Sequence, residues 1–134
     1  MMFGRERTNE DIGLWGEKQA ERALKSKGFK IIDRRVRVGR RDELDIVARD
    51  GDVLVFVEVK TRKDERFGRP ADSVDRNKRH VTSRAAVRYL RQLSKPDVLF
   101  RFDVVEVIGE MDDGKPEVRH ISNAFNLDRR YHYR

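Results

Sequence analysis

Residues 43–60 read ELDIVARDGDVLVFVEVK, and two runs rich in β-branched residues, 43–50 and 53–60, flank the triplet Asp-Gly-Asp at 50–52. This triplet between alternating apolar runs is a strong local signature of a β-hairpin. If its last two residues form a two-residue turn, the residue numbers of every cross-strand pair add up to 103. The segment therefore predicts an antiparallel hairpin with a defined register.

This register places Asp45 directly opposite Glu58 and Glu43 opposite Lys60. Because successive side chains of a strand point to opposite faces, Glu58 and Lys60 share one face of the hairpin. The other face is apolar and is expected to be the core side, with Leu44, Ile46 and Ala48 on one strand and Val55, Val57 and Val59 on the other.

Asp45 and Glu58 form an acidic pair that needs compensation. Directly opposed Cβ atoms lie roughly 5 Å apart, and two carboxylates at that distance repel by about 3 kcal/mol at an effective dielectric constant near 20. A solvated hairpin whose acids pair with nearby arginines is the simpler alternative, but it explains the array of Asp45, twelve residues and then Glu58-Val59-Lys60 less well. Mg²⁺ or Mn²⁺ prefers such hard oxygen ligands, and Lys60 offsets part of the charge.

The length of 134 residues fits one domain, expected to span 1–134 with flexible ends at about 1–8 and 123–134. Charged residues make up 41% of the chain and hydrophobic residues 37%, but the apolar residues cluster in periodic runs. This clustering favours a folded domain over a disordered chain.

Lysine and arginine outnumber aspartate and glutamate by 31 to 24, a formal charge of +7 that suits a polyanionic partner. Nucleic acid is the first candidate, and a solvated basic surface is the alternative. The absence of cysteine excludes disulfides, thiolate zinc sites and a cysteine nucleophile. No stretch is apolar enough for a secretory signal or a membrane span, so a cytoplasmic protein without membrane contact is expected.

The rest of the chain predicts two helices and three further strands. The helices are expected at about 9–27, ended by Gly28, and at 73–93, ended by Pro96; the strands are expected at 29–38, 99–108 and 117–121, with a loop at 61–72. Gly13 and Gly16 would allow the first helix to pack closely on the sheet. The predicted fold is therefore α/β, in the order α-β-β-β-α-β plus a small terminal strand, with a central mixed sheet flanked by helices.

The sequence resembles the YraN family of uncharacterised proteins, within the PD-(D/E)xK nuclease superfamily. The resemblance covers most of the chain and is carried by residues 13–17, Ala20, Leu24, Gly28, residues 43–47 and 56–62, Gly68, Pro70, Lys78 and residues 101–105. It implies a restriction-endonuclease-like fold, which archaeal Holliday-junction resolvases share, together with a metal site and nucleic-acid handling.

The resemblance also implies roles for individual residues. Asp45 and Glu58 look like the metal-binding carboxylates, with the main-chain carbonyl of Val59 as a further oxygen ligand. Lys60 looks like the residue that positions the attacking water. Glu17 matches an acid that resolvase-like members bring to the site from the first helix, although a plain surface glutamate remains the alternative.

Arginines cluster in sequence around this site, and such side chains hold phosphates without reading bases. Arg41, Arg62, Arg69 and Lys78 are the residues expected to contact nucleic acid, and an ordinary solvated role stays open for Lys78. Trp15 is expected in the core rather than as a stacking platform.

Two functions remain open from the sequence. The first is a metal-dependent endonuclease that acts on structured or branched DNA, with a homodimer suggested by analogy to the resolvases. The second is a non-catalytic nucleic-acid-binding adaptor that retains the nuclease fold. Asp42 keeps the second open, because the YraN family usually has glycine there and the aspartate adds a charge beside the site. No base-reading motif separates DNA from RNA.

Overall fold

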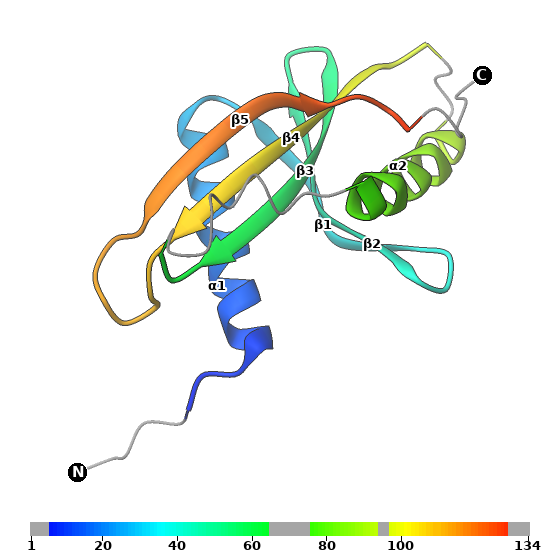
Figure 1. Ribbon diagram of the computed structural model, residues 1–134. Coiled ribbons are helices and arrows are strands. Elements are labelled where there is room, and N and C mark those ends of the chain that lie inside the picture. The colour runs from blue at the N-terminus through cyan, green and yellow to red at the C-terminus, as the bar shows by residue number, and fades with distance from the viewer. Residues whose placement is uncertain (1–5, 65–75, 94–96, 129–134) are drawn as a thin grey trace.

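The structure is a computed structural model, and it describes residues 6–64, 76–93 and 97–128 (Figure 1). Its elements are α1 (Asn9–Ser26), β1 (Lys30–Val38), β2 (Asp42–Asp50), β3 (Val53–Arg62), α2 (Arg76–Arg91), β4 (Leu99–Ile108) and β5 (Glu117–Phe125). The predicted α/β order is thus confirmed. Neither helix in the described part is long and apolar enough to cross a membrane.

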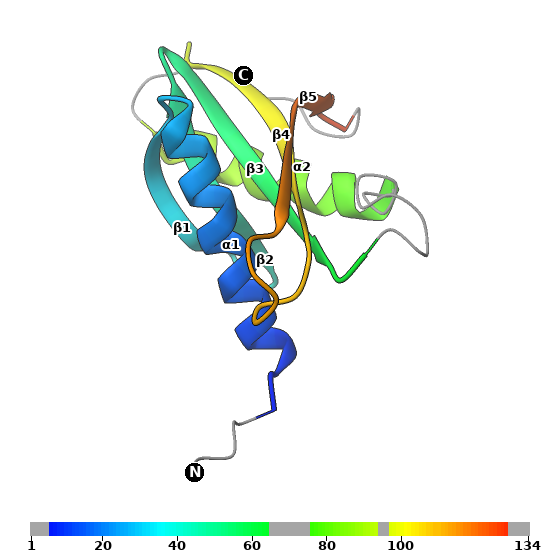
Figure 2. The ribbon, with the colours of Figure 1, turned by 90° about the vertical axis from the view of Figure 1, so that its left-hand side faces the viewer.

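The five strands form one mixed sheet in the order β1-β2-β3-β4-β5. Neighbouring strands are antiparallel except β3 and β4, which are parallel, as the connection through α2 requires. The two helices lie on opposite faces of the sheet, α1 mainly over β3 and β4 and α2 over β2 (Figures 1 and 2). The sheet is therefore covered on both sides, and each face has its own apolar core.

The predicted hairpin register is confirmed for residues 46–50 and 53–57, but the predicted pairs of Asp45 with Glu58 and of Glu43 with Lys60 are not part of the described ladder. β2 and β3 pair from Asp50 opposite Val53 to Ile46 opposite Val57, and every pair adds up to 103. Gly51 in the turn has a φ of 60°, a left-handed conformation that glycine adopts without steric cost. The described ladder ends at Ile46 and Val57, which places Asp45 and Glu58 directly beyond its last rung.

The assignment of side chains to faces is confirmed for most of the hairpin and wrong for Leu44. Ile46 and Ala48 pack with Val55 and Val57 under α1, as predicted. Leu44 instead joins the cluster under α2. The alternation therefore breaks between Leu44 and Ile46, at Asp45.

A backbone irregularity in β1 lies opposite this break. The pairing of β1 with β2 passes from Arg34 opposite Ile46 directly to Val36 opposite Leu44. Arg35 lies between them with a φ of 46°, a left-handed conformation that is uncommon for residues other than glycine. The sheet is thus distorted on both sides of Asp45.

Two strands are longer than predicted. β3 includes Thr61 and Arg62, which were expected in a loop, because parallel pairing with β4 continues to Arg62 opposite Ile108. β5 extends to Phe125, although its end was expected at 121 and a flexible tail from 123. Phe125 is buried and stacks on Phe102 with ring centroids 4.9 Å apart, which supplies an apolar contact for the added residues.

Both ends of α1 follow from local capping. Thr8 is the N-cap residue, and its side chain and that of Asp11 each accept a hydrogen bond from the other's main-chain N–H, a capping box. Gly28, with a φ of 91°, follows the helix and allows the chain to turn into β1, as predicted. The expected start of the second helix at 73–75 lies outside the described residues.

α1 approaches β3 most closely at Gly16. A Cβ atom at this position would collide with Thr61 Oγ1 and would lie 3.2 Å from Thr61 Cβ and 3.3 Å from its Cγ2. At Gly13, one turn earlier, the nearest atom to such a Cβ would be Arg35 Nη2 at 3.6 Å, an ordinary contact. Only Gly16 is therefore required for the close packing predicted for both glycines.

We expect Gly16→Ala to lower the free energy of unfolding by about 1–2 kcal/mol, because overpacking against Thr61 outweighs the higher helix propensity of alanine. Gly13→Ala is the matched control and should raise it by up to about 1 kcal/mol. Urea denaturation measures both changes. In the double variant, Thr61→Ala should remove most of the loss of stability caused by Gly16→Ala. Equal stability of Gly16→Ala and Gly13→Ala would contradict this packing.

Candidate active site

Asp45 lies where β2 and β3 separate. If the hairpin register continued, Val59 would pair with Leu44, but the N–H of Val59 donates to Asp45 Oδ2 at 2.9 Å. The Asp45 carboxylate thus accepts the hydrogen bond that the main-chain carbonyl of Leu44 would accept in a continued ladder. A charged side chain is therefore fixed in the plane of the sheet at the site that the sequence predicted.

Glu58 is buried beside this position, with only 4% of its side chain exposed. Its Oε1 lies 2.7 Å from Nζ of Lys78, which projects from α2. Lys78 was expected to contact phosphate, and the structure places it inside the candidate site as the partner of Glu58. Such an ion pair stabilises a buried carboxylate only if the attraction offsets the loss of hydration.

The electrostatics show that this offset is incomplete. Burial, and then the charge of Asp45, raise the pKa of Glu58 to about 7, although Lys78 and Lys60 act to lower it. Burial also raises the pKa of Asp45, against the hydrogen bond from Val59 and the two lysines. Burial alone would lower the pKa of Lys78, but Glu58 and Asp45 outweigh it and the pKa is raised. Even with the two lysines nearby, both acids are therefore harder to ionise than they would be in water.

Glu17 reaches the same region from α1, on the opposite side of the sheet from Lys78. Its Oε1 accepts a hydrogen bond of 2.8 Å from Nε of Arg35, the residue with the left-handed backbone. Burial raises the pKa of Glu17, Arg35 opposes this, and the charge of Asp45 raises it further. Glu17 is thus within electrostatic reach of Asp45, as the sequence predicted, and is held by an arginine.

The structure adds Glu106 to the surroundings of Lys60. The two residues are paired across the parallel strands β3 and β4, and paired residues share a face of the sheet. Glu106 is 0% exposed, neither of its carboxylate oxygens forms a hydrogen bond with the described residues, and Nη1 of Arg119 lies 3.9 Å from Oε2. The sequence offered one signal for it, a lone glutamate within an apolar strand, but that signal does not reveal which residue lies beside it.

The charge added by Asp42 is compensated. Nε and Nη2 of Arg84 on α2 each lie 2.7 Å from one of its carboxylate oxygens, and these hydrogen bonds lower the pKa of Asp42. This bidentate pair is the strong form of a charge-assisted contact. The extra acid therefore binds the hairpin to α2.

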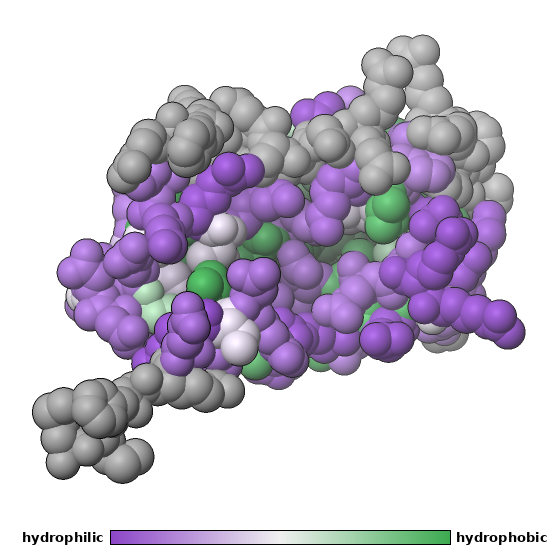
Figure 3. All heavy atoms as spheres, turned by 60° about the horizontal axis from the view of Figure 1, so that its bottom comes forward, coloured by the Kyte–Doolittle hydropathy of each residue, from purple (hydrophilic) through white to green (hydrophobic). Residues whose placement is uncertain are grey.

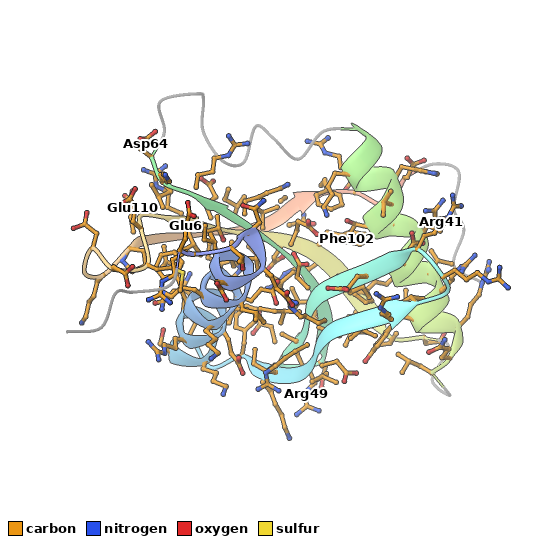
Figure 4. The ribbon with its side chains drawn as sticks, turned by 90° about the horizontal axis from the view of Figure 1, so that it is seen from below. Glu6, Arg41, Arg49, Asp64, Phe102 and Glu110 are labelled. Atoms are coloured by element: carbon orange, nitrogen blue, oxygen red, sulfur yellow. The ribbon has the colours of Figure 1, made fainter. Side chains whose placement is uncertain are left out.

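Among the described residues, Arg41 and Arg62 do not belong to the groups that most strongly shift the pKa values of the acidic pair. Arg41 is exposed in the turn that joins β1 to β2 (Figure 4), and Arg62 is the last residue of β3. Arg69 lies outside the described residues. The structure thus brings together Glu17, Asp45, Glu58, Lys60 and Lys78, and it does not place Arg41 among them.

Asp45 and Glu58 supply carboxylate oxygens, the hard donors that a cation such as Mg²⁺ prefers. Within residues 6–64, 76–93 and 97–128, no three His, Cys, Asp or Glu side chains are arranged to hold a metal ion. Mg²⁺ commonly binds through one or two carboxylates and keeps several waters, so two acids suffice. Their raised pKa values show that a nearby positive charge would be favourable.

The metal-free protein should lose stability with rising pH through Glu58. A carboxyl with a raised folded-state pKa stabilises the fold fully below its unfolded-state value, 4.5, and loses this contribution as the pH rises through about 7. We expect this group to lower the free energy of unfolding by about 3 kcal/mol between pH 5 and pH 8. Urea denaturation in chelator should show that Glu58→Gln removes this decrease, whereas Glu110→Gln, at an exposed site, should keep it. A Glu58→Gln variant with the pH dependence of wild type would contradict the assignment.

Comparison with known proteins places this site within a recognised family. Residues 16–107, which contain the five grouped side chains, match the family described as "Uncharacterised protein family UPF0102". A UPF0102 protein of Syntrophomonas wolfei is 42% identical over 117 residues, which cover 87% of this chain and 99% of that protein. A UPF0102 protein of Chlorobaculum tepidum is 45% identical over 118 residues, which cover 85% of this chain and 91% of that protein. A UPF0102 protein of Geobacter sulfurreducens is 43% identical over 119 residues, which cover 89% of this chain and 91% of that protein. The chain therefore belongs to the UPF0102 family, which is the YraN family that its motifs resemble.

Proposed function

We propose that this protein is a magnesium-dependent endonuclease of the PD-(D/E)xK superfamily that hydrolyses phosphodiester bonds in structured or branched DNA. The observation that carries the proposal is the pair of carboxylates, Asp45 partly buried and Glu58 buried, which share one electrostatic environment with two lysines. The order of the elements supports it, because the acids follow each other on β2 and β3 after a helix that supplies Glu17. A restriction-endonuclease-like fold is part of the same proposal.

The residues of the chain have distinct roles in this proposal. Asp45 and Glu58, with the main-chain carbonyl of Val59, hold the cation, and the hydrogen bond from the Val59 N–H keeps the Asp45 carboxylate in place. A bound Mg²⁺ would supply charge stabilisation at the phosphoryl oxygens and would lower the pKa of water. Lys60 orients the water that attacks phosphorus.

Two further side chains position these groups. Lys78 compensates the charge of Glu58. In this proposal it also pairs with a phosphate oxygen of the substrate. Glu106 lies beside Lys60 and restrains its ammonium through charge, since the two share a row of the sheet. Glu17 is held by Arg35 toward Asp45 and contributes negative charge at the cation site.

The net charge of +7 supports a polyanionic substrate. Arg41 and Arg69 would contact phosphates around the site without reading bases. The preference for branched DNA, the homodimer and the cytoplasmic location rest on the resemblance to the resolvases and on the composition of the chain.

Asp45→Asn should abolish the binding of Mg²⁺ and Mn²⁺ while leaving the fold at least as stable. The asparagine oxygen can still accept the hydrogen bond from Val59, and removing one charge relieves a repulsion of about 3 kcal/mol. Thermal melts with and without each cation measure this, because a ligand that binds only the folded state raises its stability, by about 2.7 kcal/mol at a concentration of one hundred times Kd. Asp52→Asn, in the exposed hairpin turn, should keep the wild-type response to the cation. Equal cation-induced shifts for wild type and Asp45→Asn would show that Asp45 is not a ligand.

A cleavage panel tests the activity directly. We expect wild type to cleave flap or four-way substrates with Mg²⁺ or Mn²⁺, in preference to single-stranded or duplex DNA, and Lys60→Ala to reduce the rate by about 10²-fold or more with little loss of binding. Lys115→Ala, at an exposed position between β4 and β5, should retain the wild-type rate. Binding of DNA by wild type without cleavage of any of the four substrates would instead favour the adaptor.

A further inference from the structure

A cavity of about 470 Å³ lies beside the proposed active site, between the start of α1, the end of β3 and the connection from β4 to β5. This volume is within the range of pockets that bind small molecules and single nucleotides. Figure 3 views the molecule from the side on which α1 begins, where green and near-white residues lie among purple ones. In Figure 4, Glu6 and Glu110, which both line the cavity, lie near the start of α1.

The apolar part of the lining contains an aromatic ring. Trp15, Ile12 and Met111 contribute it, and each is only partly buried. Trp15 was expected to be a core residue, and it does pack against the apolar cluster under α1, but it also lines the cavity. A partly exposed indole is a surface on which a nucleobase can stack.

Most charged side chains that line the cavity form ion pairs with one another. Arg7 pairs with Asp112 at 3.1 Å and Lys63 with Glu110 at 3.9 Å. Arg62 forms no ion pair with any described residue, so it remains available to a phosphate. Glu6 offers a carboxylate that accepts hydrogen bonds, which suits the amino groups on the edge of a base.

The cavity is adjacent to the proposed chemistry along β3. Thr61 and Arg62 line it and directly follow Lys60 on the same strand. At about 3.3 Å per residue, Thr61 lies about 10 Å along the strand from Glu58, but it faces α1. Arg62 follows it and by alternation shares the face of Glu58 and Lys60, so one or two nucleotides would have to pass over the end of β3 at Arg62. A base inside a duplex is stacked and paired, so only an unpaired base could enter.

We propose that this cavity binds an unpaired nucleobase of the substrate strand, stacked on Trp15, with the phosphate of the same nucleotide held by Arg62. The proposal rests on the proposed nuclease function and narrows its substrate class to nucleic acid with at least one unpaired nucleotide beside the cleaved bond. Flaps and branch points meet this requirement, whereas a fully paired duplex does not.

Trp15 is the single tryptophan of the chain, so its fluorescence reports directly on this cavity. The test is a titration in chelator, without divalent cation, using a five-nucleotide single-stranded DNA, its abasic counterpart with the same phosphates, and an RNA of the same sequence. We expect the DNA with bases to quench Trp15 and to bind about tenfold or more tightly than the abasic strand. The RNA arm shows whether the sugar matters to the same cavity. Equal affinity for the two DNA strands, without quenching by either, would overturn the proposal.

Variants separate stacking from charge, with binding measured by the anisotropy of a labelled strand. Trp15→Leu should remove the preference for the strand with bases, and Trp15→Phe, which keeps an aromatic ring, should retain most of it. Arg62→Ala should weaken both strands by a similar factor, and Arg49→Ala, at an exposed site on β2 (Figure 4), should alter neither. A base preference that survives in Trp15→Leu would contradict the stacking role.

Failure of this proposal can be distinguished from failure of the nuclease. Lys60→Ala should abolish cleavage and leave the quenching of Trp15 unchanged. Quenching with base preference in a protein that cleaves nothing would support the cavity and refute the nuclease. Cleavage by a protein that binds the strand with bases and the abasic strand equally well would support the nuclease and refute the cavity.

Discussion

The hydrogen bond from the Val59 N–H to the Asp45 carboxylate is the contact on which the candidate site depends. In an uninterrupted hairpin this N–H would be satisfied by a main-chain carbonyl of β2, and the two strands would close against each other. The carboxylate satisfies this donor and leaves the strands apart, so the Val59 N–H is not left unpaired. Charged side chains from both helices lie near this gap in the ladder.

Because helices cover both faces of the sheet, the charged side chains of the candidate site are partly shielded from water. A sheet with one solvated face would leave Glu58 in water, where a neighbouring acid costs little. Here α2 covers that face, the side chain of Glu58 is 4% exposed, and its charge must be met by protein groups. Lys78 supplies one such group, but Asp45 adds a second negative charge to the same buried region. The fold therefore keeps Asp45 and Glu58, with Lys60 and Lys78, in a region where burial raises the pKa of both acids.

The features that were predictable from the sequence are those that local chemistry decides. The turn at Gly51 and the alternation of valines determine the register of the hairpin, and the glycine after α1 determines where that helix ends. The face of Leu44 was not predictable, because the alternation breaks opposite the left-handed Arg35, which lies in another strand. The end of β5 depends on the stacking of Phe125 on Phe102, which lies in another strand.

The same distinction applies to the site. Asp45, Glu58 and Lys60 are close in sequence or belong to one hairpin, so spacing and register were enough to group them. The pairing of Lys78 with Glu58, and the burial of Glu106 beside Lys60, arise from the packing of α2 and β4 against β3. These contacts join residues distant in sequence, and a single sequence carries no local signal for them.

The pairing of Asp42 with Arg84 attaches α2 to the hairpin independently of Glu58. α2 is attached to the hairpin by two ion pairs, Lys78 with Glu58 and Arg84 with Asp42. Lys78 and Arg84 are six residues apart, about 9 Å along the helix axis, so the two attachments hold separate turns of α2. If Glu58 lost its ion pair with Lys78, the second attachment would still hold the helix over β2. A glycine at position 42 has no side chain to provide it, and the aspartate therefore gives this chain an anchor that is independent of the charge state of its candidate site.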